Sequence, residues 1–216
     1  VTNHVPSHKP LRHGGNMKKT KFTFYGCWEY EREEAELNRA SENGWQLLKG
    51  GCFHLKFQKN MDQRFIYKLD FQPEMKDEER YQEIFADQGW EYINTTYNGW
   101  IYFRKPYRED MSEEEKELYS DQNSLKEMQS RFIRIMIVLC FMEGVLFVRE
   151  FLDALFTHSL SSVFMAIATG LFTLGLAGGI VCTKLNREQR RCRIPLHASW
   201  FMPIILVIMI FAIFLP

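Results

Sequence analysis

The stretch Glu42-Asn-Gly-Trp-Gln-Leu47 decides the fold, because its Gly-Trp pair returns 45 residues later in Gly89-Trp-Glu91. In both places a charged, helical stretch precedes the glycine, and a strand-like stretch begins at the tryptophan. Glycine adopts without strain the left-handed backbone conformation that ends many helices, so we expect Gly44 and Gly89 to terminate two equivalent helices. The two pairs therefore mark the same point in two copies of one motif.

Outward from each Gly-Trp pair, the spacing of hydrophobic residues predicts a strand, a helix and two further strands. The expected elements of the first copy lie at residues 22–24, 29–43, 45–48 and 53–57. Those of the second copy lie at residues 65–70, 74–88, 90–93 and 100–105. Aligning the glycines also places Phe22 and Phe24 on Tyr67 and Leu69. Two βαββ copies predict a ferredoxin-like α+β domain, with antiparallel strands in one layer and two helices in the other.

Composition divides the 216 residues into four regions. Residues 1–16 are rich in Pro, Gly, His and Asn, and we expect a disordered extension. The repeat forms a soluble domain at residues 17–106, which we expect to fold on its own. Residues 107–131 predict a helical connector, because Ser112 and Ser124 each precede a glutamate by three residues, the spacing of a capping box. Residues 132–216 are dominated by apolar side chains and predict a transmembrane region.

Three apolar stretches, at about residues 132–152, 160–183 and 198–215, predict three membrane-spanning helices. The first contains Glu143, which makes its insertion marginal, whereas the second is uncharged. Between the second and third stretches, residues 184–193 hold five basic residues and one acidic residue. Because basic loops stay inside the cell, we expect a multi-pass protein of the cell membrane with a cytoplasmic N-terminal domain and its C-terminus outside.

The sequence contains no motif of a serine hydrolase, a zinc protease or a phosphate-binding loop, so we predict a protein without enzymatic activity, cofactor or metal site. A formal net charge of zero argues against direct binding to nucleic acid. The acidic run at residues 29–36 is interpreted as the solvated face of a helix.

Two groups of residues are candidates for a functional role. The first group could line a groove for a partner or ligand, or fill the core of a small domain; it consists of Trp28, Trp45, Trp90 and Trp100. The second group lies in the first apolar stretch, where Glu143 is ionisable at membrane depth and Arg149 and Glu150 follow it. Glu143 is either a protonated packing residue, bonded to Thr169 or Thr173, or part of a polar path.

Five short motifs follow one another in the soluble domain. They are Glu36-Leu-Asn38, Glu42-Asn-Gly-Trp-Gln-Leu47, Tyr67-Lys-Leu-Asp70, Gly89-Trp-Glu91 and Trp100-Ile-Tyr-Phe-Arg-Lys105. In this order they resemble the DUF 2812 family (domain of unknown function 2812) of bacterial membrane proteins, over about residues 20–106. One departure is Ala35-Glu36, where the family commonly carries a tryptophan. The family has no established activity, and its members resemble partners of PadR-type transcriptional repressors encoded beside them. The resemblance implies a regulatory protein whose cytoplasmic domain binds another protein.

Two functions fit these features best, and a membrane-associated enzyme is a weaker third alternative. In the first, the chain is a regulatory or interaction protein whose helices sense envelope stress or a lipid-like compound, and an exposed aromatic or apolar patch is expected on the soluble domain. In the second, the chain is an accessory subunit of a transporter, and Glu143 faces a polar cavity. The expected partners are the lipid bilayer and a transcriptional regulator or transporter. The sequence is also compatible with a homo-oligomer.

Overall fold

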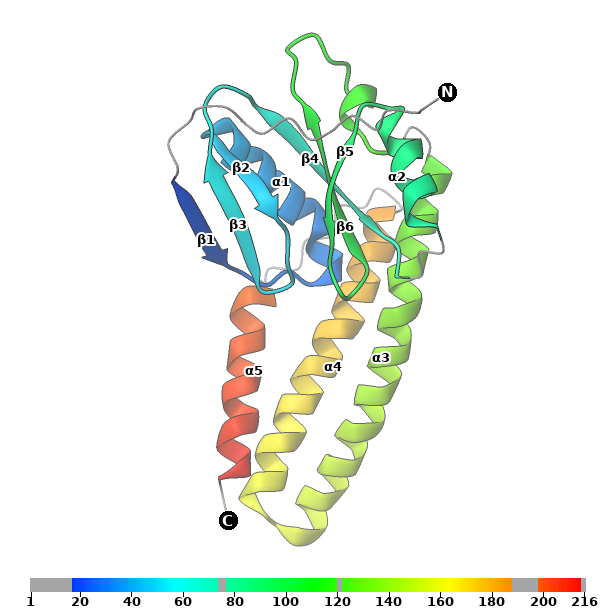
Figure 1. Cartoon of the computed structure of the whole chain (residues 1–216). Coiled ribbons are helices and arrows are strands. Elements are labelled where there is room, and N and C mark those ends of the chain that lie inside the picture. Colours follow the sequence, from blue (N-terminus) through cyan, green and yellow to red (C-terminus); the bar gives the residue numbers. More distant parts are fainter. Residues whose placement is uncertain (1–16, 74–76, 120–121, 188–197, 215–216) are drawn as a thin grey trace.

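The computed structural model describes residues 17–73, 77–119, 122–187 and 198–214 (Figure 1). The first copy of the repeat consists of β1 (Lys18–Phe22), α1 (Tyr30–Glu42), β2 (Trp45–Lys49) and β3 (His54–Lys59). The second copy consists of β4 (Phe65–Phe71), α2 (Glu78–Ala86), β5 (Glu91–Thr95) and β6 (Trp100–Pro106). The predicted duplication is confirmed, because both copies have the same order of elements.

The two helix ends have the predicted geometry. Gly44 has a φ of +73° and Gly89 a φ of +83°, values that favour glycine over any residue with a side chain. In each copy the glycine N–H donates a 2.8 Å hydrogen bond to the carbonyl three residues earlier, that of Ser41 or of Ala86. The repeated Gly-Trp pair therefore ends a helix and starts a strand in both copies.

Each copy forms its own three-stranded antiparallel sheet, in the orders β1-β3-β2 and β4-β6-β5. The α+β class is thus confirmed, whereas a single ferredoxin-like sheet is not what the chain forms. The outer edge of β4 meets α1 instead of a strand of the first sheet. The two sheets approach each other where the Gly50 N–H donates to Asn94 Oδ1 (2.8 Å) and the Asn94 side chain donates back to the Gly50 carbonyl (3.0 Å).

The first strand differs from its prediction. β1 ends at Phe22 and all of its residues are exposed, whereas β4 has six buried residues among seven. Lys19 lies opposite Phe57, and Leu69 lies opposite Tyr102, the residue 45 positions after Phe57. Lys19 is therefore the counterpart of Leu69, and the alignment of Phe22 and Phe24 with β4 is wrong. The chain enters the first sheet several residues earlier than the repeat period suggests.

Three further helices, α3 (Gln122–Thr157), α4 (Leu160–Arg187) and α5 (Ala198–Ile213), lie side by side below the sheets (Figure 1). Among the described residues, only Leu160–Leu185 of α4 is long and apolar enough to cross a bilayer, and Pro203–Ile213 of α5 is a shorter apolar segment. In α3, the apolar run is interrupted by Glu143 and by Arg149 and Glu150. The structure thus supports one candidate span and not the three predicted.

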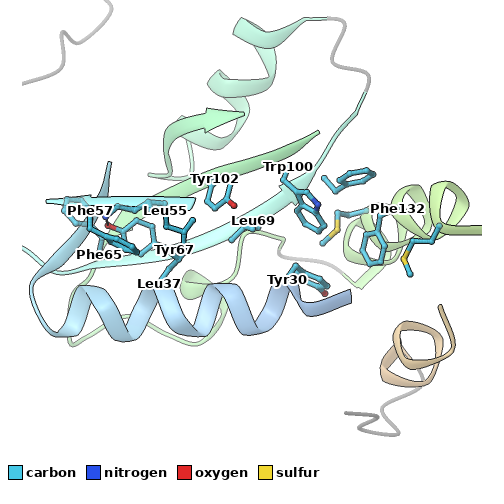
Figure 2. Close-up of a cluster of buried hydrophobic side chains, with 14 of the residues drawn as sticks. Tyr30, Leu37, Leu55, Phe57, Phe65, Tyr67, Leu69, Trp100, Tyr102 and Phe132 are labelled. Atoms are coloured by element: carbon cyan, nitrogen blue, oxygen red, sulfur yellow. Dashed lines mark hydrogen bonds between the residues drawn. The ribbon is translucent and has the colours of Figure 1, made fainter. Parts of the chain in front are cut away.

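The first turns of α3 belong to the core of the domain that the two copies form (Figure 2). Met128, Phe132, Ile133 and Met136 are buried there, and the Phe132 ring lies about 6 Å from the rings of Tyr30, Phe71 and Trp100. The core therefore continues beyond residue 106, and the expected boundary at residues 131–132 falls inside a single helix.

The predicted helical connector at residues 107–131 contains a short 3₁₀ turn and, from Gln122 on, the first turns of α3. Ser112 and Glu115 bond each other's backbone N–H groups, at 3.2 and 2.9 Å, as a capping box does, but they start only the short 3₁₀ turn Glu114–Lys116. Ser124, the second predicted helix start, lies inside α3. The predicted extension at residues 1–16 lies outside the described residues.

Candidate functional site

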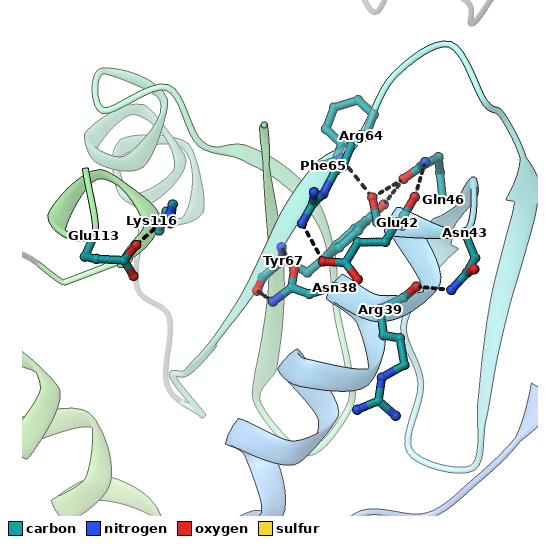
Figure 3. Close-up of polar contacts among 11 residues, drawn as sticks. Asn38, Arg39, Glu42, Asn43, Gln46, Arg64, Phe65, Tyr67, Glu113 and Lys116 are labelled. Atoms are coloured by element: carbon teal, nitrogen blue, oxygen red, sulfur yellow. Dashed lines mark hydrogen bonds and ion pairs between the residues drawn. The ribbon is translucent and has the colours of Figure 1, made fainter. Parts of the chain in front are cut away.

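The outer edge of β4 is covered by polar side chains of α1. Three backbone N–H groups of β4 donate to them: Phe65 to Ser41 Oγ (2.8 Å), Tyr67 to Asn38 Oδ1 (2.7 Å) and Leu69 to Glu34 Oε1 (2.8 Å). Figure 3 shows the Asn38 contact. The acceptors are spaced by four and three residues, so they share one face of the helix. Because a buried strand edge without partners is costly, this face of α1 acts in place of a missing strand.

A buried glutamine, Gln46, joins the two copies at the C-terminal end of α1. Gln46 is fully buried, and its side-chain carbonyl accepts a 3.1 Å hydrogen bond from the Tyr67 hydroxyl (Figure 3). Its amide group donates to the carbonyls of Gln63 (2.8 Å) and Asn60 (3.2 Å). The Tyr67 hydroxyl also accepts from the Leu47 N–H at 2.9 Å, and burial raises the pKa of Tyr67 to about 12. Because these groups satisfy one another, the network fixes how the copies meet.

Three residues of the acidic run, Glu29, Glu33 and Glu34, are buried, so the interpretation of this run as a solvated face is wrong for them. Glu33 accepts a 2.6 Å hydrogen bond from the Tyr102 hydroxyl, and burial raises the pKa of Glu33 to about 7. Burial also raises the pKa of Glu34 to about 7, although the neighbouring Lys68 opposes the shift. The helical period alone does not reveal that strands of the second copy cover this face.

A cleft of about 640 Å³ lies between α1, β4 and the segment that leads into α3. Its lining includes Tyr30, Glu31, Glu34, Asn38, Lys68, Glu117, Tyr119, Leu125 and Met128. In its wall, Lys68 forms ion pairs with Glu34 (3.2 Å) and Glu117 (2.7 Å). Burial by itself would lower the pKa of Lys68, but the two carboxylates outweigh burial and raise it. The cleft offers charged and apolar groups together, as binding sites for peptides and small molecules do.

Asp70 ties α2, the connector and α3 to β4. Its fully buried carboxylate accepts hydrogen bonds from the hydroxyls of Tyr81 and Tyr119, and Arg131 of α3 lies 3.4 Å away. Arg131 also donates a 2.8 Å hydrogen bond to the Phe71 carbonyl. Burial and the Asp70 charge raise the pKa of both tyrosines, which keeps them neutral donors. A shift of α3 would therefore disturb this cluster.

Trp28 connects the domain of the two copies to the two long helices, α3 and α4. Its ring lies so close to Gly179 of α4 that a Cβ there would be 2.5 Å from Trp28 Cε3, and 2.9 Å from the methyl group of Met136 in α3. The indole N–H is buried and has no hydrogen-bond partner among the described residues. Close packing thus requires glycine at position 179, and this contact sets the position of the domain along the axis of α4.

The contacts at β4, Asp70 and the start of α3 lie inside the match to one protein family. The model of the family described as "Protein of unknown function (DUF2812)" covers residues 29–141, more than half of the chain. The chain belongs to the DUF2812 family. No curated protein and no solved structure matches the chain. The DUF2812 match reaches into α3, in agreement with a core that includes the first turns of this helix.

The motifs by which the sequence resembles DUF2812 carry the buried polar contacts. Asn38 and Tyr67 bond each other across α1 and β4, Gln46 joins the two copies, and Asp70 holds Arg131. Sequence reasoning missed these roles, although one signal was available. Glu34, Asn38 and Ser41 form a polar stripe at helical spacing. Such a stripe suits the edge of a strand as well as it suits water.

The four candidate tryptophans do not form one surface. Trp90 (2% exposed) and Trp100 (8% exposed) lie in two different hydrophobic clusters of the DUF2812 core. Trp45 is half-buried beneath Lys19, whose ammonium group lies 4.1 Å from the ring centre. Trp28 meets the helices. The four rings are thus divided among the core, the first sheet and the junction with α4. They lie apart because each begins or precedes a different helix or strand.

The candidate residues of the first apolar stretch do not come together in one site. Glu143 is half-buried on α3 and has no hydrogen bond or ion pair with the described residues. The hydroxyls of Thr169 and Thr173 donate to carbonyls of their own helix, at 2.9 and 2.8 Å. Arg149 lies 3.9 Å from Glu150, its neighbour in sequence. None of these residues lines the cleft described above, which lies between α1, β4 and the segment that leads into α3.

Proposed function

We propose that this DUF2812 protein is a non-catalytic, membrane-anchored regulatory protein whose cytoplasmic domain binds a protein partner. A PadR-type transcriptional repressor is the partner that we favour, and the helices sense envelope stress or a membrane-soluble compound. The observation that carries this proposal is the continuity of α3, which buries Met128 and Phe132 in the core of the domain and runs without a break to Thr157. A displacement of α3 in the membrane is thereby transmitted to the domain.

The side chains of the helices support membrane anchoring. Large hydrophobic side chains are exposed along α3, α4 and α5, among them Phe141, Phe156, Leu174, Val207 and Phe211. Exposed apolar surface of this extent is unfavourable in water and is typical of contact with lipid. We therefore propose that α3 and α5 accompany α4 in the bilayer as a multi-pass unit. The domain lies at the end of α4 that carries Lys184, which supports a cytoplasmic location with the C-terminus outside (Figure 1).

The coupling between helices and domain can be tested with one glycine pair. Gly179→Leu displaces Trp28, whereas Gly144→Leu adds a side chain where no atom lies within 4 Å. In native membranes, we expect Gly179→Leu to speed amide hydrogen exchange at residues 27–30 and to reduce co-purification of the repressor encoded beside the gene. Gly144→Leu should leave both readouts unchanged. Equal behaviour of the two variants, or capture of no repressor by the parent protein, would reject the proposal.

An accessory role in a transporter is the second candidate, and the environment of Glu143 favours it. An ionisable group in an apolar helix needs a partner, and the described part of this chain supplies none. Another subunit, or another copy of this chain in a homo-oligomer, would have to supply the partner of Glu143. Arg149 and Glu150 would then belong to the same polar path. Glu143→Gln keeps most of the hydrogen-bonding capacity and removes the charge. Loss of a transport activity in this variant, with normal assembly, would favour the transporter role.

A further inference from the structure

Three connections of the soluble domain lie at the end of the sheets that faces the helices (Figure 1). They are the end of β1 with the link that follows it, the β2–β3 loop and the β5–β6 turn. Each presents one large aromatic side chain to the outside: Phe22 is 82% exposed, Phe53 is 59% exposed and Tyr97 is 86% exposed. Single exposed aromatic residues are common, but three on neighbouring connections need an explanation.

The three connections are bound to one another. The Thr23 N–H donates to the Phe53 carbonyl at 3.1 Å, and the Cys52 thiol donates to the Asn98 side chain at 3.2 Å. The Phe24 and Phe53 rings stack with their centres 5.7 Å apart. The connections that carry the exposed rings are therefore held together, although no part of the described protein covers these rings.

The contact between Trp28 and α4 sets the position of this end of the domain along the axis of α4. Gly179 lies six residues before Leu185, where the candidate span ends, which corresponds to about 9 Å along the helix axis. Trp28 follows the β1 link by a few residues, so the three connections lie near the level at which α4 leaves the apolar layer. Aromatic side chains are enriched at this level in membrane proteins.

The charges beside the rings fit an anionic surface. Lys49 and Lys56 are exposed and lie opposite each other on β2 and β3, close to the Phe53 loop. Lys21, next to Phe22, is partly exposed and bonds to Glu36. Lysine side chains near a membrane surface are attracted by anionic headgroups. A water-filled gap between the domain and the bilayer would leave the three rings exposed to water, and would leave Lys49 and Lys56 without anionic groups beside them.

We propose that Phe22, Phe53 and Tyr97 form a lipid-contact edge, which seats the DUF2812 domain on the anionic headgroup layer of the membrane that α4 enters. This proposal rests on the membrane anchoring proposed above. The edge adds a second attachment to the one at Trp28. With both, the domain cannot turn about α4, so a movement of α3 changes the internal contacts at Asp70 and the cleft.

The test uses the full-length protein in lipid nanodiscs with a photoreactive p-benzoylphenylalanine at a single position. Position 53 probes the edge, and position 61 is the matched control, because Met61 is 69% exposed on the β3–β4 connection at the opposite end of the sheets. After irradiation, mass spectrometry measures the lipid adduct. We expect at least about threefold more adduct at position 53 than at position 61, since the control probe faces water. Equal yields, or a cross-linked second copy or other protein at position 53, would overturn the proposal.

A third probe at position 171 separates this inference from the anchoring on which it rests. Leu171 is an exposed residue of α4, so an adduct there reports insertion of the helix. An adduct at position 171 without one at position 53 rejects the lipid-contact edge alone, whereas no adduct at position 171 rejects both proposals. Exchanging Lys49→Glu together with Lys56→Glu should lower the yield at position 53 in anionic nanodiscs and leave it unchanged in zwitterionic ones. An unchanged yield in both would remove the electrostatic part of the proposal.

Discussion

The two copies of the repeat have the same order of elements but bury different residues. In α1, Glu34, Asn38 and Ser41 bond the outer edge of β4. The residues 45 positions later in α2, Glu79, Glu83 and Ala86, are exposed. Likewise β1 is exposed at the edge of its sheet and β4 is buried. A sequence repeat thus sets local structure, while the neighbours of each copy decide which of its faces is buried.

The largest expected effect concerns α3, whose buried side chains complete the core and have no equivalent in either copy of the repeat. Met128, Phe132, Ile133 and Met136 complete the shared core, and the loss of each such side chain costs about 2–5 kcal/mol. Since domains are stable by only about 5–15 kcal/mol, a fragment of residues 17–106 should show no cooperative thermal unfolding by circular dichroism. A fragment of residues 17–141 in mild detergent should show it. Equal melting of the two fragments would mean that the repeat is a complete domain.

The next test contrasts two glutamates at equivalent positions, Glu33 and Glu78. Glu33 is buried against Tyr102, and burial raises the pKa of Glu33 from 4.5 to about 7. Glu78 is exposed, 3.2 Å from the hydroxyl of Tyr92. Between pH 4.5 and 7 the folded protein keeps a proton on Glu33 that the unfolded chain has lost. The free energy of unfolding should therefore fall as the pH rises through this window, by at most about 3 kcal/mol.

Glu33→Gln should make this pH dependence smaller, because Gln cannot ionise and still accepts a hydrogen bond from Tyr102. Some dependence should remain, since burial also raises the pKa of Glu34 to about 7. Glu78→Gln serves as the control and should behave like the parent. The measurement is chemical unfolding of the detergent-solubilised protein at several pH values between 5 and 8. A slope that Glu33→Gln leaves unchanged would contradict the assignment.

A third test addresses the edge of β4. Asn38→Ala removes the acceptor for the Tyr67 N–H and leaves a buried donor without a partner, which should lower the free energy of unfolding by about 1–3 kcal/mol. Glu83→Ala, at the equivalent position of α2, should change it by less than about 0.5 kcal/mol. Thermal unfolding of both variants is the measurement. Similar losses in the two would show that α1 has no special role at β4.

The smallest expected difference is between the two helix-ending glycines. Gly44→Ala and Gly89→Ala should each cost about 1 kcal/mol, because both backbones are left-handed. Gly44→Ala should cost somewhat more, since its Cβ would lie 3.3 Å from the Asn60 carbonyl and would displace Met61. At Gly89 the nearest atom is the flexible end of Lys105, at 3.4 Å. The midpoints of thermal unfolding give the order, and the reverse order would count against the described packing.

The sequence by itself determined the duplicated βαββ order, the two helix ends and the family. These features depend on backbone preferences and on hydrophobic spacing within about a dozen residues, which is the range that sequence patterns report. α1, for example, was expected at residues 29–43 and runs from Tyr30 to Glu42. The apolar character of α4 was also evident, because an uninterrupted apolar run of this length needs no partner to be recognised.

Only the tertiary structure decided the separation into two sheets, the burial of Glu33 and Glu34, and the inclusion of α3 in the core of the two copies. Each depends on groups far apart in sequence: Asn38 meets Tyr67 29 residues away, and Glu33 meets Tyr102 69 residues away. A charged or amide side chain at helical spacing suits either water or a strand edge. Which of the two it meets is set by how the copies pack, because burial and hydrogen bonding depend on neighbours that local patterns do not contain.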